Sequence, residues 1–401
     1  MTSVSAPEGD SAVRALGNPK QMRLQSIPGS AQAGCVTDSP DPSERRATEF
    51  VEAGLKADAT AAAVLDAVRS GDEAAFAVLA ERYRRPLLAH CYRMLGSIDD
   101  AEDLVQETLL RAWRGREGFE GRSLFRTWLY RIATNVCLNA LERAPRRVMP
   151  HDVAPPVKPG FNPGDARDTP AWAPEMPWLQ PCPDHLLEAA ASNDTDPHAM
   201  TVSREGIELA FLAALQHLPP RSRAILILRE VLGWSAKETA TLLEMTVPSV
   251  NAALQRARET MRARRPSGGQ VTAPSATVTA DEHDVLNRFM QAWERADVEA
   301  LTALLREDAR WSMPPAPLWF DGRDAIAGLL SLFPPSRLGD IRMVATTANR
   351  QPSAIGYLRA HGQSEFRLTG LNVLRIENGE IAEITTFSPP LLSAFHFPPT
   401  L

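Results

Sequence analysis

The chain has 401 residues and a formal net charge of −6. This length exceeds what one hydrophobic core normally holds, so we expect two or three domains. A negative net charge ordinarily argues against a nucleic-acid partner, but here the charges are segregated. Arginines cluster at 122–147 and 256–265, whereas residues 99–107 hold five acidic residues and no basic one. Because local patches set the affinity for phosphate, the net charge does not exclude a nucleic-acid partner.

Composition disfavours several other classes of protein. No apolar run approaches the roughly 20 residues that a membrane span needs. Residues 1–50 lack the apolar core of a signal peptide, so we expect a cytoplasmic protein without a membrane partner. The four cysteines have no Cys-x-x-Cys spacing and the histidines do not cluster near them, which argues against a metal site or a disulfide framework. We expect no metal and no cofactor, and we interpret Cys137 as a small core residue.

The first two segments are an expected disordered extension over 1–58 and a helical domain over 59–147. In this domain, residues 101–113 repeat apolar side chains at three- and four-residue spacing, which predicts an amphipathic helix. Its polar face carries Asp103, Gln106 and Glu107. This acidic face indicates a protein partner.

A second helix is predicted over 126–147, with its buried face at Leu129, Ala133 and Val136. Its outer stripe should have no packing role. Arginine suits phosphate, asparagine suits base edges and an aromatic ring suits stacking on an unpaired base, so the stripe favours an opened DNA strand. The residues of this predicted surface are Arg122, Arg126, Trp128, Arg131, Asn135 and Asn139.

Residues 148–203 are rich in proline and are predicted to be a linker. One segment inside it, WLQPCPDHLLE, is unusually apolar. We interpret Trp178, Pro181 and Asp184 as a docking element that contacts the C-terminal domain or the first helical domain. The alternative is an aromatic residue in a mobile loop.

Residues 204–266 form a predicted helix-turn-helix domain. Gly233 ends one helix, and Ser235 with Glu238 has capping-box spacing at the start of the next. The last helix has Pro248 in its first turn. Its inner face is predicted at Val250, Leu254, Ala257 and Met261, and its outer, DNA-reading face comprises Ser249, Ala252, Gln255, Arg256 and Arg258.

A short linker, 267–280, leads to a predicted α+β domain over 281–401. Two helices are predicted over 281–297 and 298–308, a strand over 309–315 and a third helix over 321–333. Strands are then predicted over 341–351, 354–361, 364–377 and 380–387, in a curved antiparallel sheet. Asn378-Gly379 is the strongest hairpin signal.

Taken together, the strings DLVQET and FRTWLYRIA and the following asparagine pair resemble region 2 of sigma-70 family RNA polymerase sigma factors of the extracytoplasmic-function type. The helix-turn-helix resembles region 4, and the WLQPCPD segment resembles a linker motif of such factors, with Cys182 where an aromatic residue is commoner. The resemblance implies that Asp103, Gln106 and Glu107 bind core RNA polymerase. It implies that the outer stripe of 126–147 holds the −10 strand and that Gln255 and Arg256 read the −35 element of promoter DNA. Asn251, Ala252 and Ala253 depart from the larger or charged residues common there.

The C-terminal domain resembles the SnoaL-like, or nuclear transport factor 2-like, cone, on its order of elements and on WSMPP followed by WFDGRDAI. Some relatives of such cones are enzymes, and the candidate pocket residues are Trp311, Met313, Trp319, His361 and Asp308. No acid–base pair stands out among them. We therefore expect a regulatory domain, which could dock within the chain, and not an enzyme.

Two alternative functions remain open. A DNA-binding regulator independent of polymerase would bind duplex DNA tightly without core enzyme. A small-molecule enzyme localised by the helical half would carry activity in the cone.

Overall fold

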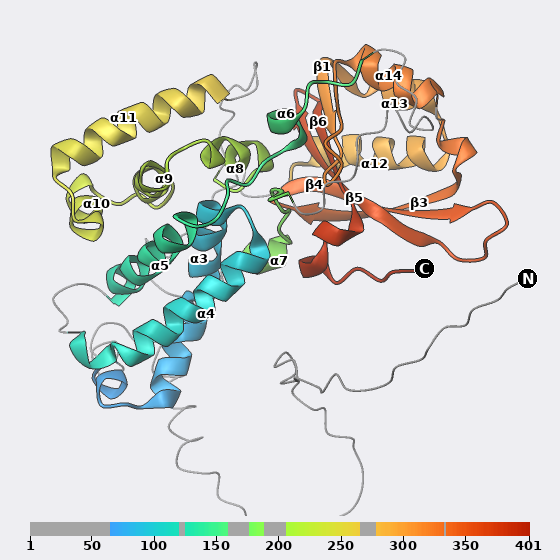
Figure 1. Ribbon diagram of the computed structural model, residues 1–401. Helices are drawn as coiled ribbons and strands as arrows, with labels where there is room; N and C mark the ends of the chain where they lie inside the picture. The colour runs from blue at the N-terminus through green and yellow to red at the C-terminus, as the bar shows by residue number, and fades with distance from the viewer. Residues whose placement is uncertain (1–64, 120–124, 159–175, 188–205, 265–277, 333) are drawn as a thin grey trace, which may run out of the picture.

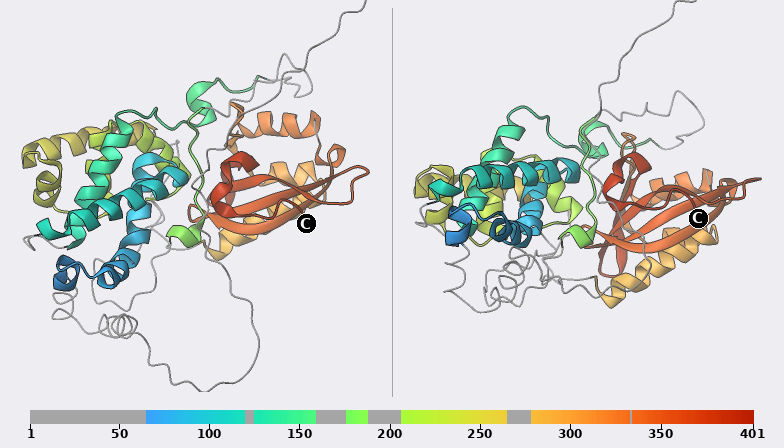
Figure 2. Two further views of the ribbon diagram at one scale, coloured as in Figure 1. Left: turned by 60° about the horizontal axis from the view of Figure 1, so that its bottom comes forward. Right: turned by 90° about the horizontal axis from the view of Figure 1, so that it is seen from below.

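The structure is a computed structural model that describes residues 65–119, 125–158, 176–187, 206–264, 278–332 and 334–401. A helical half and a sheet half lie side by side, and the linker segment runs between them (Figures 1 and 2). The expected extension over 1–58 lies outside the described residues. No helix in the described ranges is both long and apolar enough to cross a membrane.

The first helical domain is built on α3 (Glu73–Leu95), α4 (Ile98–Arg114) and α5 (Phe125–Leu141). Asp72 caps α3 by accepting a hydrogen bond from the Ala75 amide at 3.0 Å. Gly96 ends α3 in the left-handed region, at φ 71°, and Ser97 caps α4. A short 3-10 turn, η1 (Arg116–Gly118), follows α4. The conformational freedom of Gly96 therefore sets the sharp turn between α3 and α4.

The second helical domain holds α8 (Leu209–Gln216), α9 (Pro220–Leu226), a π-helical turn η2 (Ile227–Val231), α10 (Ala236–Leu243) and α11 (Val247–Arg264). Both bonds of the predicted capping box are present, between Ser235 and Glu238. The predicted inner residues of α11 are all buried, and its outer residues are exposed. The helix-turn-helix expected from the sequence is confirmed.

The cone begins with α12 (Ala280–Glu294) and α13 (Val298–Ala303), and α14 (Arg323–Leu332) lies beside the first strands. Its strands are β1 (Leu305–Ser312), β2 (Trp319–Asp321), β3 (Gly339–Ala348), β4 (Gln351–Ala360), β5 (Arg367–Glu377) and β6 (Glu380–Phe387). Short 3-10 turns are η3 (Pro335–Arg337), η4 (Pro389–Leu391) and η5 (Ser393–Phe395). The sheet order is β2-β1-β6-β5-β4-β3.

Three expectations about the cone were wrong in detail. The second helix ends at Ala303, and residues 305–308 belong to a strand. The sheet is mixed, because β1 pairs with β6 in parallel. The turn between β3 and β4 falls at Asn349-Arg350, inside the expected first long strand, and both residues have positive φ, as a tight hairpin turn requires. The predicted α+β cone is otherwise present, and Asn378-Gly379 forms the last hairpin.

The two faces of the sheet join different cores. Leu374, Ile384 and Ala354 pack in the core under α12. Leu371, Val373 and Phe387, on the opposite face, belong to the same core as the two helical domains. Because one apolar core crosses from helices to sheet, the described parts pack together as a closed arrangement.

Candidate polymerase and nucleic-acid interfaces

The acidic face of α4 points outward. Asp103 and Gln106 are exposed, and Glu107 pairs with Arg111 at 2.7 Å. Burial and the nearby acidic residues raise the pKa of Glu102. One of the groups that lower this pKa is His396, from the end of the cone, and the Ser393 hydroxyl donates to Asp99 at 3.1 Å. The C-terminal segment of the cone therefore flanks the predicted polymerase surface.

The outer stripe of α5 does have a packing role, contrary to expectation. The Trp128 ring lies 5.2 Å from Phe119 and 5.6 Å from Phe125, so it closes the end of the bundle. Asn135 and Asn139 are exposed. Arg122 lies outside the described residues. A stripe of 3.6-residue period shows which side chains share a face, but not which neighbours cover that face.

The helix-turn-helix domain covers part of this stripe. Arg131 of α5 pairs with Glu244, in the turn before α11, at 2.7 Å. The Tyr130 ring lies 5.7 Å from Trp234, and the Arg126 guanidinium lies over Trp234 at 5.9 Å. Two of the residues predicted to hold DNA therefore contact the other DNA-binding domain.

The outer face of α11 is open by comparison. Ser249, Ala252, Gln255 and Arg256 are all exposed. The Ser249 hydroxyl lies 2.8 Å from that of Thr246, near the start of the helix. Arg258 differs, because it pairs with Glu230 at 2.5 Å.

The linker segment is buried between the two halves. It contains α6 (Pro150–Val153) and α7 (Asp184–Leu187). Trp178 is 1% exposed, and Pro181 is buried. Gln180 fastens the segment to the start of α4, since its side-chain oxygen accepts hydrogen bonds from the Ser97 hydroxyl at 2.9 Å and the Ile98 amide at 3.0 Å. Asp184 accepts a hydrogen bond from the Arg350 amide at 2.6 Å.

Asn349, in the β3–β4 turn, joins linker, helices and cone. Its side-chain oxygen accepts from the Cys182 amide at 2.9 Å. Its side-chain nitrogen donates to the Tyr92 hydroxyl at 2.9 Å and to the Ile207 carbonyl at 2.8 Å. Sequence reasoning missed this residue. The available signal was an asparagine in an apolar strand pattern, a residue type that tolerates positive φ.

Two buried arginines tie the helical domains together. Arg223 of α9 donates to the Met94 carbonyl of α3 and, at 2.7 Å, to the Gln216 side chain. Arg93 of α3 donates to the Gly206 carbonyl at 2.7 Å. Burial lowers the pKa of both guanidinium groups to about 10, so both remain charged at neutral pH. Each buried charge needs its carbonyl partners, which makes separating the domains costly in free energy.

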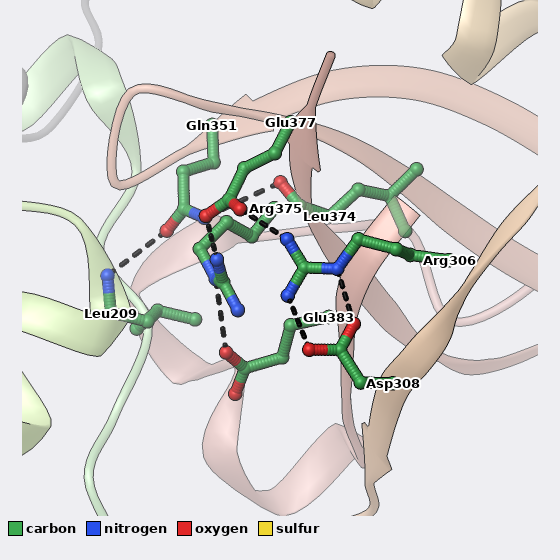
Figure 3. Close-up of polar contacts among 8 residues, drawn as sticks. All are labelled: Leu209, Arg306, Asp308, Gln351, Leu374, Arg375, Glu377 and Glu383. Carbon is green, nitrogen blue, oxygen red and sulfur yellow. Dashed lines mark hydrogen bonds and ion pairs between the residues drawn. The ribbon is translucent and has the colours of Figure 1, made fainter. Parts of the chain in front are cut away.

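The five candidate pocket residues of the cone do not gather in one place. His361 and Asp308 are exposed, Trp311 donates to the Thr386 hydroxyl at 2.9 Å, and Trp319 donates to the Ala154 carbonyl at 2.8 Å. Figure 3 shows instead an ionic network of Arg306, Asp308, Arg375, Glu377 and Glu383. Near it, Gln351 accepts a hydrogen bond from the Leu209 amide of α8 at 2.9 Å.

Three protein families match successive parts of the chain. Sigma-70 region 2 matches residues 79–147, Sigma-70 region 4 matches 208–261 and the SnoaL-like domain matches 286–384. The ECF RNA polymerase sigma factor SigG of Mycobacterium tuberculosis (strain H37Rv) is 40% identical over 346 residues, which cover 86% of this chain and 88% of that protein. The RNA polymerase sigma-H factor of Pseudomonas aeruginosa is 30% identical over 196 residues, 49% of this chain and 89% of that protein.

A solved structure shares the fold. The crystal structure of the Mycobacterium tuberculosis extracytoplasmic function sigma factor SigJ has a TM-score of 0.50 and 19% identity, and the match covers 78% of this chain and 97% of that one. The chain belongs to the extracytoplasmic-function RNA polymerase sigma factors and carries a C-terminal SnoaL-like domain. It binds core RNA polymerase and promoter DNA and directs the initiation of transcription.

Proposed function

We propose that the residues predicted from the sequence divide these tasks among three surfaces. Asp103, Gln106 and Glu107 bind the polymerase, the outer stripe of α5 holds the opened −10 strand, and the outer face of α11 reads the −35 element. The support is that most of these residues are exposed on the expected helices, whereas Glu107, Arg126 and Trp128 are half-buried. The exposed ones are Asp103 and Gln106 on α4, Arg131, Asn135 and Asn139 on α5, and Ser249, Ala252, Gln255, Arg256 and Arg258 on α11. The protein acts in the cytoplasm, where its polymerase partner is.

The arrangement of the two DNA-binding domains supports a resting state that cannot read a promoter. Promoter elements near −10 and −35 lie about 25 base pairs apart, or about 85 Å of duplex at roughly 3.4 Å per base pair. In the closed chain, Arg131 of α5 and Glu244 of the helix-turn-helix are in contact at 2.7 Å. The domains must therefore separate when both elements are bound, and the observation that carries the proposal is this contact.

In this proposal the cone is a regulatory domain, not a catalyst. It shares a core with the helical domains and holds the linker through Asn349, so it stabilises the closed state. Binding of core polymerase must compete with that stabilisation, because a ligand shifts an equilibrium only through its different affinities for the two states. The strength of the cone contacts should therefore set the activity of the factor.

The cone's role can be tested with one side chain in the full-length protein. Asn349→Gly removes three side-chain hydrogen bonds, each worth about 1 kcal/mol, and glycine keeps the positive φ without strain. We expect promoter-dependent transcription with core polymerase to rise severalfold. Asn378→Gly is the matched control, because Asn378 has nearly the same φ and is exposed in another hairpin turn. Equal transcription by the unmodified protein, Asn349→Gly and Asn378→Gly would show that the cone is an independent module that does not regulate transcription.

The polymerase surface needs a separate test. Reversing the charges with Asp103→Lys and Glu107→Lys should weaken binding to core polymerase at least tenfold, because both residues lie off the buried face of α4. Asp284→Lys with Glu380→Lys makes the same charge change at exposed positions on the cone and should leave the affinity unchanged. Affinity would be measured by competition for labelled core enzyme. If Asp103→Lys with Glu107→Lys still co-purifies with core polymerase as the unmodified protein does, the acidic face of α4 is not the polymerase-binding surface.

A further inference from the structure

A cavity of about 420 Å³ lies where the three parts of the protein meet. Its walls come from the segment after α5, from α8 and the end of α11, and from strands β1 and β6 of the cone. The charged or titratable residues that line it are Arg146, His151, Asp152, His217, Arg264, Arg310 and Glu383. This volume is in the range of small-molecule sites.

The acidic groups in the cavity are already engaged by protein partners. Asp152, whose side chain is 5% exposed, accepts from the Met149 amide at 2.9 Å and lies 3.0 Å from Nε2 of His217. Glu383 accepts from Nε of Arg375 at 3.2 Å. Each of these carboxylates is thus already held by another group of the protein.

Two arginines in the cavity wall can each bind an additional anionic group. Within the described ranges, neither Arg264 nor Arg310 has a carboxylate within ion-pair distance. The Arg310 guanidinium lies over the Trp319 ring at 5.0 Å, and its buried Nε has no hydrogen-bond partner. Nδ1 of the neighbouring His151 is likewise buried without a partner. Buried polar atoms without a hydrogen-bond partner cost free energy and point to a group that would complete the cavity.

The rest of the lining is apolar, and four of its six residues are alanines. It consists of Met149, Leu209, Ala210, Ala213, Ala214 and Ala263. Alanines on one face of α8 leave room for a flat or aliphatic body. The cavity thus combines a cationic end with an apolar wall, which is the usual design of a site for a small organic anion.

We propose that this cavity binds a small phosphorylated molecule, with its phosphoryl group between Arg264 and Arg310 and its organic part against α8. Guanidinium groups match phosphoryl oxygens in bidentate geometry, and a tetrahedral phosphoryl group offers oxygens to arginines that come from different elements. A planar carboxylate, with two oxygens, satisfies two separated guanidinium groups less well.

The site has a consequence that rests on the proposed closed resting state. Because its walls come from the end of region 2 and the start of the linker, from region 4 and from the cone, the complete cavity exists only while these parts are packed together. A ligand that binds this form and not the open one stabilises it by RT ln(1 + [L]/Kd). By the same linkage, it weakens binding to core polymerase.

The binding test uses the free full-length chain without polymerase. Pyrophosphate and AMP are the probes, citrate is the carboxylate comparison, and calorimetry measures the affinity at fixed ionic strength. We expect saturable binding of a phosphorylated probe, weakened at least tenfold by Arg264→Gln with Arg310→Gln. Arg262→Gln with Arg295→Gln makes the same charge change at exposed positions outside the cavity and should bind normally. Arg264 is exposed, so Arg264→Gln alone preserves the fold and should weaken binding severalfold.

The outcomes separate this proposal from the regulatory one. Equal binding by the cavity and control variants, no saturable binding of either phosphorylated probe, or preference for citrate would each overturn the site. Binding does not depend on transcription, so the Asn349→Gly experiment can fail while the site stands, and the reverse is also possible. Loss of binding in the cavity variants alone supports the site.

Discussion

The two helices of this sigma factor that we propose contact DNA differ in how much of their outer face is exposed. The outer face of α11 is exposed, with Gln255 and Arg256 pointing to solvent. On α5, Arg131 is paired with Glu244 and the Arg126 guanidinium lies over Trp234. The difference indicates that the closed chain hides part of the proposed −10 surface and leaves the proposed −35 surface open. Control of this factor should therefore act on α5.

The largest expected effect concerns the open surface. Arg256→Ala should weaken binding of the holoenzyme to −35 DNA by roughly 1–3 kcal/mol if Arg256 pairs with a guanine. Arg258→Ala, on the same helix, should have a smaller effect because Glu230 already holds that guanidinium. Titrations with cognate and scrambled duplexes at two salt concentrations would separate base contacts from phosphate contacts. If Arg256→Ala binds both duplexes normally, α11 does not read DNA with this face.

An intermediate effect concerns the packing of α3 against α5, the helix whose outer face is partly covered. His90 of α3 lies 3.0 Å from the Thr134 hydroxyl of α5, and burial lowers its pKa from 6.5 to about 3. Between these values the unfolded chain binds a proton that the folded chain does not, so stability falls as pH drops below 6.5. At pH 5.5 the contribution is about 1.4 kcal/mol.

His90→Gln should remove that part of the pH dependence, as measured by denaturant unfolding of the full-length protein between pH 7.5 and 5.5. His361→Gln, at an exposed position of the cone, is the matched control for the loss of one histidine. A slope that His90→Gln leaves unaltered would mean that another group titrates.

The smallest expected effect tests the contact between α5 and the helix-turn-helix domain. Glu244→Gln breaks an exposed ion pair worth about 0.2–1 kcal/mol and frees Arg131. The free chain should then bind a single-stranded −10 oligonucleotide up to about fivefold more tightly, as measured by fluorescence anisotropy. Glu117→Gln changes the charge equally on an exposed residue that pairs with Arg116. An equal gain in both variants would assign the effect to net charge.

The elements of the helical half were predictable because their signals are local. Ser235 and Glu238 mark a helix start through bonds only three residues apart, and the inner face of α11 follows from a 3.6-residue period. The parallel pairing of β1 with β6 was not predictable in this way. Leu305 and Ile381 are partners across 76 residues of sequence, and nothing in the chain near either residue specifies the other.

The same distinction between local and long-range signals applies to the candidate surfaces. The residue types on α4, α5 and α11 indicated the family, which the comparisons show, and predicted which helices contact DNA. Only the structure shows which residues contact them. Glu244 forms an ion pair with Arg131, the Phe119 ring packs near the Trp128 ring, and the Cys182 amide donates a hydrogen bond to Asn349. Helix periodicity and capping are set by residues a few positions apart, so the sequence displays them directly. The closed arrangement depends on packing between distant segments, where one apolar face fits several partners, and only the folded chain selects among them.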